Sequence, residues 1–202
     1  MRRIIINEHL SLDGVIQGPG GPDEDTTGGF ELGGWSATYS DDVTRETLFA
    51  ALNEEYDLLL GRFTFDIWEP YWPNQSGPIA EKFNKIKKYV ATQTLSDANW
   101  EGTVLLNGDT IEQVKALKAG DGPDLHMWGS ADFIQSLFRH GLIDQINLWI
   151  YPVVLGKGKK LFAGGTLPSG LKLTKSAVSS TGVICATFIP NGEVPTGNAA
   201  DD

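Results

Sequence analysis

A chain of 202 residues, with 41% hydrophobic and 21% charged residues, suits one soluble domain with a good-sized core. Its net charge of −10 argues against a nucleic-acid backbone or an anionic membrane as partner, but is compatible with binding a small anion. No stretch approaches the roughly 20 apolar residues of a membrane helix, and the short run of isoleucines near the start is too brief for a signal-peptide core. Cys185 is the only cysteine, so no internal disulfide can form and a cytoplasmic location is expected.

The first predicted elements are a strand and a long loop. The apolar run after the two N-terminal arginines predicts a buried strand that ends in a turn at Asp13-Gly14. Residues 17–35 are rich in glycine and acids and lack periodicity. A loop of this length inside a compact domain is usually functional or disordered. Phe30 and Trp35 favour the functional alternative, with the loop folded over a pocket, because a disordered linker has little use for aromatic residues.

From residue 40 onward, predicted helices and strands alternate. Ser40 can cap a helix over residues 41–56, whose first turn carries acids as the helix dipole favours. A capping-box pattern at Asp109–Glu112 opens a second helix, which Gly120 closes. The other elements, in chain order, are a strand at 56–61, a short helix at 62–68, strands at 87–92, 102–107 and 124–128, a helix at 131–140, and strands at 144–156, 171–180 and 182–190.

This order of elements predicts the fold class. Strands that alternate with helices form an α/β sheet that is parallel in the middle, and the final hairpin adds an antiparallel C-terminal edge. We expect a single domain over residues 1–190. Residues 191–202 contain no core residues, so we expect a mobile tail there.

Three strand ends carry small or hydroxyl residues of the kind that hold phosphate groups. They are Gly61-Arg62-Phe63-Thr64, Ala91-Thr92-Gln93-Thr94 and Gly129-Ser130-Ala131. Glycine lets a phosphate approach the backbone, helix N-termini offer free N–H groups, and Arg62 adds a charge-assisted contact. Each motif alone is typical of an ordinary turn or helix cap. Together, at the edge of the sheet where ligands bind, they favour an extended dinucleotide, although G-x-G-x-x-G and G-K-[ST] are absent.

Other common kinds of catalytic site are missing from the sequence. His9, His126 and His140 lie on separate predicted elements without ligand spacing, so we expect no metal site. Cys185 lies in the middle of an apolar strand, where a thiol is normally inert, and there is no G-x-S-x-G nucleophile motif. Hydride transfer fits what remains, because in such reactions the cofactor carries the difficult chemistry.

Four segments of the sequence resemble a known family. "SLDGVI", "LLLGRFTF", "KYVATQTL" and "HMWGSADFIQSLFRHGLIDQINLWIYPVVLGKGKKLF" resemble the dihydrofolate reductase-like superfamily, in particular the reductase domain of the bifunctional riboflavin-biosynthesis deaminase-reductase and its stand-alone bacterial relatives. The resemblance extends over about residues 2–190. It implies a dihydrofolate reductase-like mixed sheet with helices on both faces, an NADPH-dependent reductase, and a homodimer.

The resemblance also implies roles for individual residues. Gly61, Arg62 and Thr64 would hold cofactor phosphates, Thr92 and Gln93 would lie by the adenosine phosphate, Gly129, Ser130 and Ala131 would hold the pyrophosphate, and Val15 and Ile16 would flank the nicotinamide. Riboflavin-pathway reductases tend to carry a lysine at the position of Asn7 and a glutamate at that of Trp128. Loss of a cation and an acid, and gain of an indole, favour a flatter or less polar substrate.

The substrate side of the site is therefore expected to involve Asn7, Trp128 and the loop aromatics Phe30 and Trp35. Dihydrofolate reductases also carry an acid on the helix before the Gly-Arg turn. Asp42 and Asp41 are the nearest candidates for a catalytic acid, and the alternative is that they are solvated acids of a first helical turn.

The expected function is an NADPH-dependent reductase of a pyrimidine-, pteridine- or flavin-like heterocycle, resembling 5-amino-6-(5-phosphoribosylamino)uracil reductase. The alternative is a protein that binds a nucleotide cofactor without turnover. The predicted strand at 144–156 supports the homodimer, since it carries Asn147, Trp149 and Tyr151 opposite its aliphatic row and large aromatics are enriched in interfaces. Helices of the same domain could instead cover these aromatics.

Overall fold

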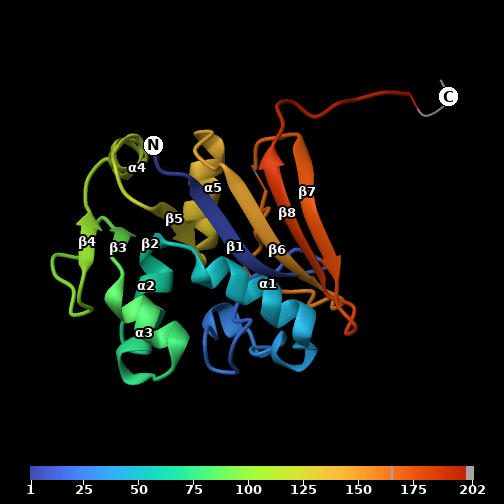
Figure 1. Cartoon of the computed structure of the whole chain (residues 1–202), viewed down its shortest axis with the longest axis horizontal. Coiled ribbons are helices and arrows are strands. Elements are labelled where there is room, and N and C mark those ends of the chain that lie inside the picture. The colour runs from blue at the N-terminus through green and yellow to red at the C-terminus, as the bar shows by residue number, and fades with distance from the viewer. Residues whose placement is uncertain (165, 199–202) are drawn as a thin grey trace.

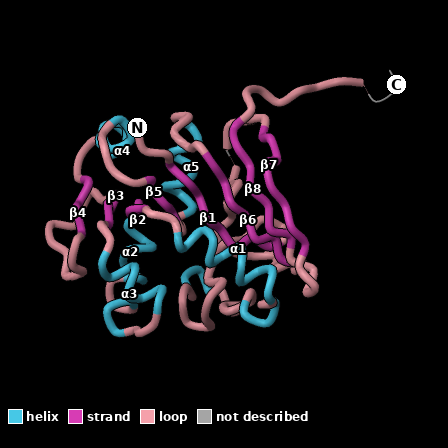
Figure 2. The backbone as a smooth tube through the Cα atoms, in the orientation of Figure 1, coloured by secondary structure: helices cyan, strands magenta, loops and turns pink. Residues whose placement is uncertain are grey.

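In the part of the chain that the computed structural model describes, residues 1–164 and 166–198, eight strands form one mixed sheet (Figure 1, Figure 2). The strands are β1 (Ile4–Ser11), β2 (Tyr56–Gly61), β3 (Lys88–Ala91), β4 (Thr103–Leu106), β5 (Asp124–Met127), β6 (Gln145–Tyr151), β7 (Leu171–Val178) and β8 (Ile184–Pro190). Their order across the sheet is β4-β3-β2-β5-β1-β6-β8-β7. The strands from β4 to β6 in this order run parallel, whereas β8 is antiparallel to β6 and β7 is antiparallel to β8. The predicted parallel centre and antiparallel C-terminal edge are confirmed.

Helices cover both faces of this sheet, as expected. The α-helices of the described residues are α1 (Asp42–Asn53), α2 (Arg62–Trp68), α3 (Pro78–Lys85), α4 (Thr110–Ala119) and α5 (Ala131–Arg139). Helices α4 and α5 pack on one face, and α1, α2 and α3 pack on the other. None of these helices combines the length and apolar character that crossing a bilayer requires.

The buried run of β2 shows why the centre of the sheet needs two helical layers. Leu59 packs in the cluster under α4 and α5, whereas Leu58 and Leu60 pack in the cluster under α1, α2 and α3. All three leucines have no exposed surface, because successive side chains of a strand point to opposite faces. Burial of each one stabilises the fold by about 1.5–3 kcal/mol relative to exposure.

The structure corrects the start of α1. Asp41, and not Ser40, is the N-cap, since its carboxylate accepts a hydrogen bond from the Thr44 N–H at 2.9 Å. The Thr44 hydroxyl accepts in return from the Asp41 N–H at 2.8 Å. This reciprocal pair satisfies two N–H groups that would otherwise lack partners at the helix start. The helix ends at Asn53, earlier than predicted, because the chain enters β2 at Tyr56.

Helix α3 was not predicted from the sequence, because it is short and buries only Ala80 and Phe83. Pro78 lies in its first turn, which is a start signal that could have revealed it. By contrast, the predicted cap of α4 is confirmed, since Asp109 accepts from the Glu112 N–H at 3.1 Å.

The aromatic row of β6 lies inside the domain. Trp149 and Tyr151 are buried beneath α1 and the segment before it. The Trp149 indole N–H donates to the Thr47 hydroxyl on α1 at 2.8 Å, and the Tyr151 ring meets the edges of Trp35 and Tyr39. The alternative that the same domain covers this face is therefore correct, and this row forms no surface for a second subunit.

The predicted tail falls partly outside the described residues, since 199–202 are not described. Residues 191–198 are exposed and contain no helix or strand among the described positions. The mobility of the tail stays a prediction.

Candidate functional site

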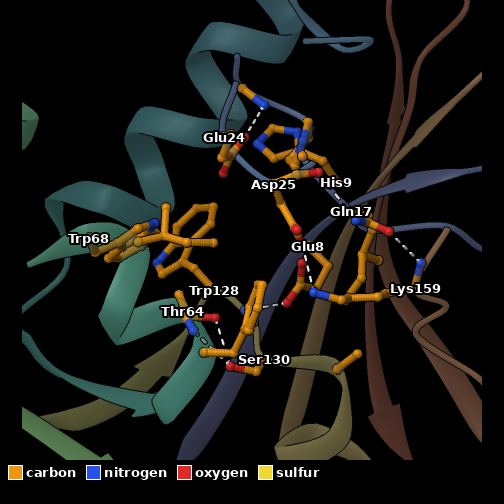
Figure 3. A pocket seen from close by; sticks show the side chains of 18 of the residues that line it. Glu8, His9, Gln17, Glu24, Asp25, Thr64, Trp68, Trp128, Ser130 and Lys159 are labelled. Atoms are coloured by element: carbon orange, nitrogen blue, oxygen red, sulfur yellow. Dashed lines mark hydrogen bonds and ion pairs between the residues drawn. The ribbon is translucent and has the colours of Figure 1, made fainter. Parts of the chain in front are cut away.

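A cavity of about 1250 Å³ opens beyond the carboxyl ends of β1, β2 and β5 (Figure 3). Its walls come from the end of β1, the loop at 16–25, helices α1, α2 and α3, the turn at 128–132, and the segment at 158–164. Ligands of open α/β sheets bind at this edge, because the loops that join strands to helices meet there. The cavity has a polar part around the β5–α5 turn and an aromatic part between α1, α2 and α3.

Two glycines bring the β2–α2 and β5–α5 turns into contact. A Cβ atom on Gly61 would lie 2.5 Å from the Ser130 hydroxyl oxygen, and one on Gly129 would lie 2.6 Å from the Thr64 hydroxyl oxygen. Gly129 also has φ +85°, a conformation that favours glycine. The space left open lets the Thr64 and Ser130 hydroxyls hydrogen-bond at 2.8 Å. Two motifs distant in the sequence thus form one wall of the cavity.

The start of α5 gives this wall the properties of an anion site. Ser130 is the N-cap, but among the described residues its side chain caps no backbone N–H of its own helix and is bonded to Thr64. The first N–H groups of α5 therefore lack a side-chain cap, and Ala131 and Asp132 line the cavity. Free N–H groups and the helix dipole favour an anion there. Gly129, Ser130 and Ala131 have small side chains that fit the pyrophosphate of a dinucleotide, whereas the carboxyl-bearing Asp132 also lines the cavity.

Arg62 and the end of β3 form a second polar cluster beside the cavity. The Arg62 guanidinium donates to Asp66 at 2.6 Å through Nε and to the Thr94 hydroxyl at 3.1 Å through Nη1. Thr92 is buried and accepts from the Thr94 N–H at 3.3 Å. Gln93 turns away and donates to the Gly108 carbonyl at 2.7 Å. The structure thus places Arg62 and Thr92 side by side, whereas the Gln93 side chain is engaged with the β4–α4 loop.

The aromatic part of the cavity is lined by residues of the three helices that cover this face, of the connection between α2 and α3, and of the turn after β5. They are Leu48, Leu52, Ile67, Trp68, Tyr71, Trp72, Ile79, Phe83 and Trp128. Trp68 stacks on Phe83 with ring centres 5.0 Å apart, and Trp128 stacks on Trp149 at 5.9 Å. The indole nitrogens of Trp72 and Trp128 are buried without a hydrogen-bond partner among the described residues. Flat aromatic rings suit a planar molecule, whereas the two indole N–H groups are enclosed by the protein.

Glu8 and His9 on β1 also line the cavity. Sequence reasoning did not single out Glu8, and it considered His9 only as a metal ligand. The Gly129 N–H donates to Glu8 Oε1 at 2.5 Å. Burial raises the pKa of Glu8 to about 8, so the carboxyl is protonated at neutral pH. His9 hydrogen-bonds through Nδ1 to the Tyr151 hydroxyl at 2.7 Å, and burial lowers its pKa to about 4. The available signal was a pair of ionisable residues inside a buried strand, which is rare unless the pair has a role.

Several predicted site residues lie elsewhere. Asn7 is fully buried and accepts from Asn147 Nδ2 at 2.9 Å, since its side chain points to the other face of β1 from Glu8. Phe30 is buried outside the cavity wall, and Trp35 packs on Tyr151 and donates to the Gln17 carbonyl at 2.8 Å. Asn7, Phe30 and Trp35 do not line this cavity, and their contact with a substrate stays a prediction.

The two candidate catalytic acids also lie elsewhere. Asp41 caps α1 and accepts from the Ser180 N–H at 2.8 Å, and Asp42 is an exposed partner of Arg45. Neither lines the cavity. Val15 is buried behind the wall, whereas Ile16 lines it. Within the described part of the chain, no group of three or more His, Cys, Asp or Glu side chains is arranged to hold a metal ion.

Comparison with known proteins adds to this geometry. A family model described as the RibD C-terminal domain matches residues 2–185. The uncharacterized protein YyaP of Bacillus subtilis (strain 168) is 31% identical over 196 residues, which cover 95% of this chain and 96% of YyaP.

Solved structures share the fold at low identity. A putative riboflavin biosynthesis protein from Shewanella sp. PV-4 superposes with a TM-score of 0.71 at 20% identity, over 94% of this chain and 99% of that one. Dihydrofolate reductase from Enterococcus faecalis, complexed with NADP(H), gives 0.58 at 14% identity, over 94% and 96%. A Thermotoga maritima deaminase/5-amino-6-(5-phosphoribosylamino)uracil reductase gives 0.61 at 12% identity, over 94% of this chain and 57% of that one.

Proposed function

The chain belongs to the RibD C-terminal domain family, and from this premise we propose that it is an NADPH-dependent reductase of a small flat heterocycle of the pyrimidine, pteridine or flavin kind. One observation carries the proposal: a single cavity joins an anion site at the start of α5 to a chamber lined by the aromatic rings of Trp68, Trp72 and Trp128. A dinucleotide cofactor and a planar substrate need these two environments side by side.

The residues of the polar part would hold the cofactor. Gly129, Ser130 and Ala131 are suited to the pyrophosphate, and the Thr64 hydroxyl borders the same wall. Arg62, with Thr92, is suited to the adenosine 2′-phosphate. Bound NADPH would supply the hydride. The E. faecalis structure supports this choice, since a protein with this fold is complexed there with NADP(H).

The aromatic chamber favours a substrate without a phosphate group. Of the cavity-lining residues in the described chain, the cations are Lys159 and Lys160. Lys159 is ion-paired with Asp25 at 2.8 Å and lies over the ring of Phe63, next to Thr64 in the chain. No Lys or Arg side chain among the described residues lines the aromatic part, so a phosphorylated ribosylaminopyrimidine would bury its charge there unpaired. We place the protein in the cytoplasm, where its lone thiol would stay reduced.

A steady-state screen that follows NADPH absorbance tests the proposal. The panel contains pterins, flavins, quinones, and ribosylaminopyrimidines with and without the phosphate. We expect turnover of phosphate-free planar rings, with kcat/KM at least about tenfold above that of phosphorylated ones, because desolvating an unpaired phosphate costs several kcal/mol. NADPH binding by calorimetry without oxidation across the panel would instead favour a cofactor-binding protein without turnover.

A matched pair of glycine variants tests the anion site itself. Gly129→Ala places a methyl group against Thr64 and should weaken NADPH binding by about tenfold or more. Gly182 has nearly the same φ, +86° against +85°, but lies in the turn between β7 and β8, away from the cavity. Gly182→Ala should therefore show the strain of the substitution without the loss of affinity.

A further inference from the structure

Glu8 is a buried carboxyl group that the binding roles above leave unused. Its side chain lines the cavity and the residue is 5% exposed. The Gly129 N–H holds Oε1 at 2.5 Å, and no ion pair involves Glu8 among the described residues. Figure 3 shows the carboxyl in the middle of the site, between Trp128 and Gln17. Gly129 belongs to the anion site and Trp128 to the aromatic chamber, so Glu8 lies where the two parts of the cavity meet.

The charged and titratable groups around Glu8 disfavour a carboxylate at this position. Glu24, on the loop at 16–25, adds a like charge. Lys159, on the opposite wall, is already paired with Asp25. His9, the neighbour on β1, is neutral, and Asp132 at the start of α5 carries the same sign as Glu8. Burial and Glu24 together raise the pKa of Glu8 to about 8, although the Gly129 N–H acts in the opposite direction.

We propose that Glu8 is the proton donor of the reaction. This inference rests on the proposed function. The Gly129 N–H keeps Oε1 as the acceptor, which leaves the proton on Oε2. Reduction of a C=N bond adds two electrons and one hydrogen at carbon, which bound NADPH would supply as hydride, and one proton at nitrogen, which Glu8 Oε2 would supply. The O–H bond of Glu8 breaks as the N–H bond of the substrate forms. The carboxylate stays bonded to Gly129 and takes a proton from solvent before the next cycle.

The alternative is that Glu8 only fastens the β5–α5 turn. Glu8→Gln separates the two roles, since the amide oxygen can still accept from Gly129 while the amide cannot act as an acid. If Glu8 donates the proton, Glu8→Gln keeps wild-type NADPH affinity and thermal stability but lowers kcat by about 10²- to 10⁴-fold. Equal losses of affinity, stability and kcat would overturn the donor role in favour of the fastening role.

Infrared spectroscopy of the protein without cofactor gives a readout that does not depend on turnover. We expect the carbonyl band of a protonated carboxyl at neutral pH, absent in Glu8→Gln, with a titration midpoint near 8. Because the acid form is the active one, kcat should fall as the pH rises through the same midpoint. Glu24→Gln, which removes the neighbouring charge, should shift both midpoints to lower pH.

Failure of the donor role and failure of the reductase proposal give different results. If the wild type turns over a substrate and Glu8→Gln retains that turnover, or if the carboxyl band is missing at neutral pH, the donor role is wrong and the reductase proposal stands. If the wild type binds NADPH but oxidises it with no member of the panel, the reductase proposal is wrong and the donor role falls with it.

Discussion

Burial changes the charges of the residues on which the cavity depends. In the sequence, Glu8 and His9 are an adjacent acid and base, but the pKa of Glu8 rises to about 8 and that of His9 falls to about 4. Both side chains are therefore neutral near pH 7, and the floor of the cavity carries no net charge from this pair. A neutral pair of side chains at this position suits an uncharged ring of the substrate. The phosphate groups of the cofactor must then be bound by residues at the edge of the site.

Arg62 is the residue on which the choice of cofactor should depend. A charged hydrogen bond contributes roughly 1.5–3 kcal/mol, so Arg62→Ala should weaken NADPH binding by about 10- to 100-fold and NADH binding far less. Calorimetric titration with both cofactors measures this. Equal weakening of both would mean that Arg62 does not contact the 2′-phosphate.

A variant at Asp66 tests the same role of Arg62 in the opposite direction, and one at Arg45 is the control. The Asp66 carboxylate is bonded to Arg62 Nε at 2.6 Å and offsets part of the guanidinium charge. Asp66→Asn should therefore tighten NADPH binding and leave NADH binding unchanged. Arg45→Ala, on an exposed arginine of α1 paired with Asp42, should affect neither cofactor.

At the level of elements, the loop at 17–35 is part of the scaffold of the site. Its first half lines the cavity, whereas Phe30 and Trp35 anchor its second half. The Gly34 N–H donates to the Gly18 carbonyl at 2.8 Å, and Asp25 is ion-paired with Lys159 across the loop. The loop is thus fixed at several points, because its aromatic side chains turn toward Tyr151 and the core.

Trp35→Ala should accordingly lower stability more than it lowers affinity, the reverse of what the sequence suggested. Loss of packing on Tyr151 and of the bond to Gln17 should reduce the free energy of unfolding by about 2 kcal/mol. Urea denaturation and substrate titration measure the two effects. Trp35→Phe keeps a ring against Tyr151 and should lose only about 1 kcal/mol, the usual contribution of a neutral hydrogen bond. A large loss of affinity with unchanged stability would place Trp35 in the substrate site.

At the level of the whole molecule, the two edges of the sheet differ. Strand β7 forms one edge, and almost all of its residues are exposed on both faces. Leu173 and Val178 on this strand, and Ile184 on β8, have exposed apolar side chains, and Val178 is paired with Ile184 in the sheet. An exposed edge strand with apolar side chains is a site where another chain can pair. We propose that the homodimer expected from the resemblance forms here, and not through the buried row of β6.

Light scattering at micromolar concentration tests this proposal, with an expected mass of twice the 21.9 kDa of one chain. Leu173→Lys should reduce the mass to that of a monomer, because it places a charge in the proposed interface. Val104→Lys alters a similarly exposed residue on β4, at the opposite edge of the sheet, and should leave the dimer intact. A monomeric wild type would rule the dimer out.

The positions along the chain of the strands and of most helices followed from local patterns, whereas the order of the strands across the sheet was not predicted. The run at 58–60, the cap at Asp109 and the glycine at the end of α4 each depend on neighbours within a few residues, so periodicity and turn chemistry were sufficient. The same holds for the glycine turns at Gly61 and Gly129, whose sequence predicted an anion site; the binding of an anion there stays a prediction. Helix α3 was not predicted because its apolar face is too short to give a clear helical period.

The composition of the cavity depended on contacts between distant parts of the chain. Glu8 meets Gly129 because β1 and β5 are neighbours in the sheet, 121 residues apart in sequence. The packing of Trp35 inside the domain depends on its contact with Tyr151, which the sequence does not show. In the same way, the register of β1 on β6 decides that the Asn7 side chain meets Asn147 and not the cavity. A pKa depends on burial and on neighbouring charges, which are properties of the folded surroundings and not of the residue. The role that we propose for Glu8 as proton donor therefore depends on the pairing of β1 with β5, which the sequence alone does not show.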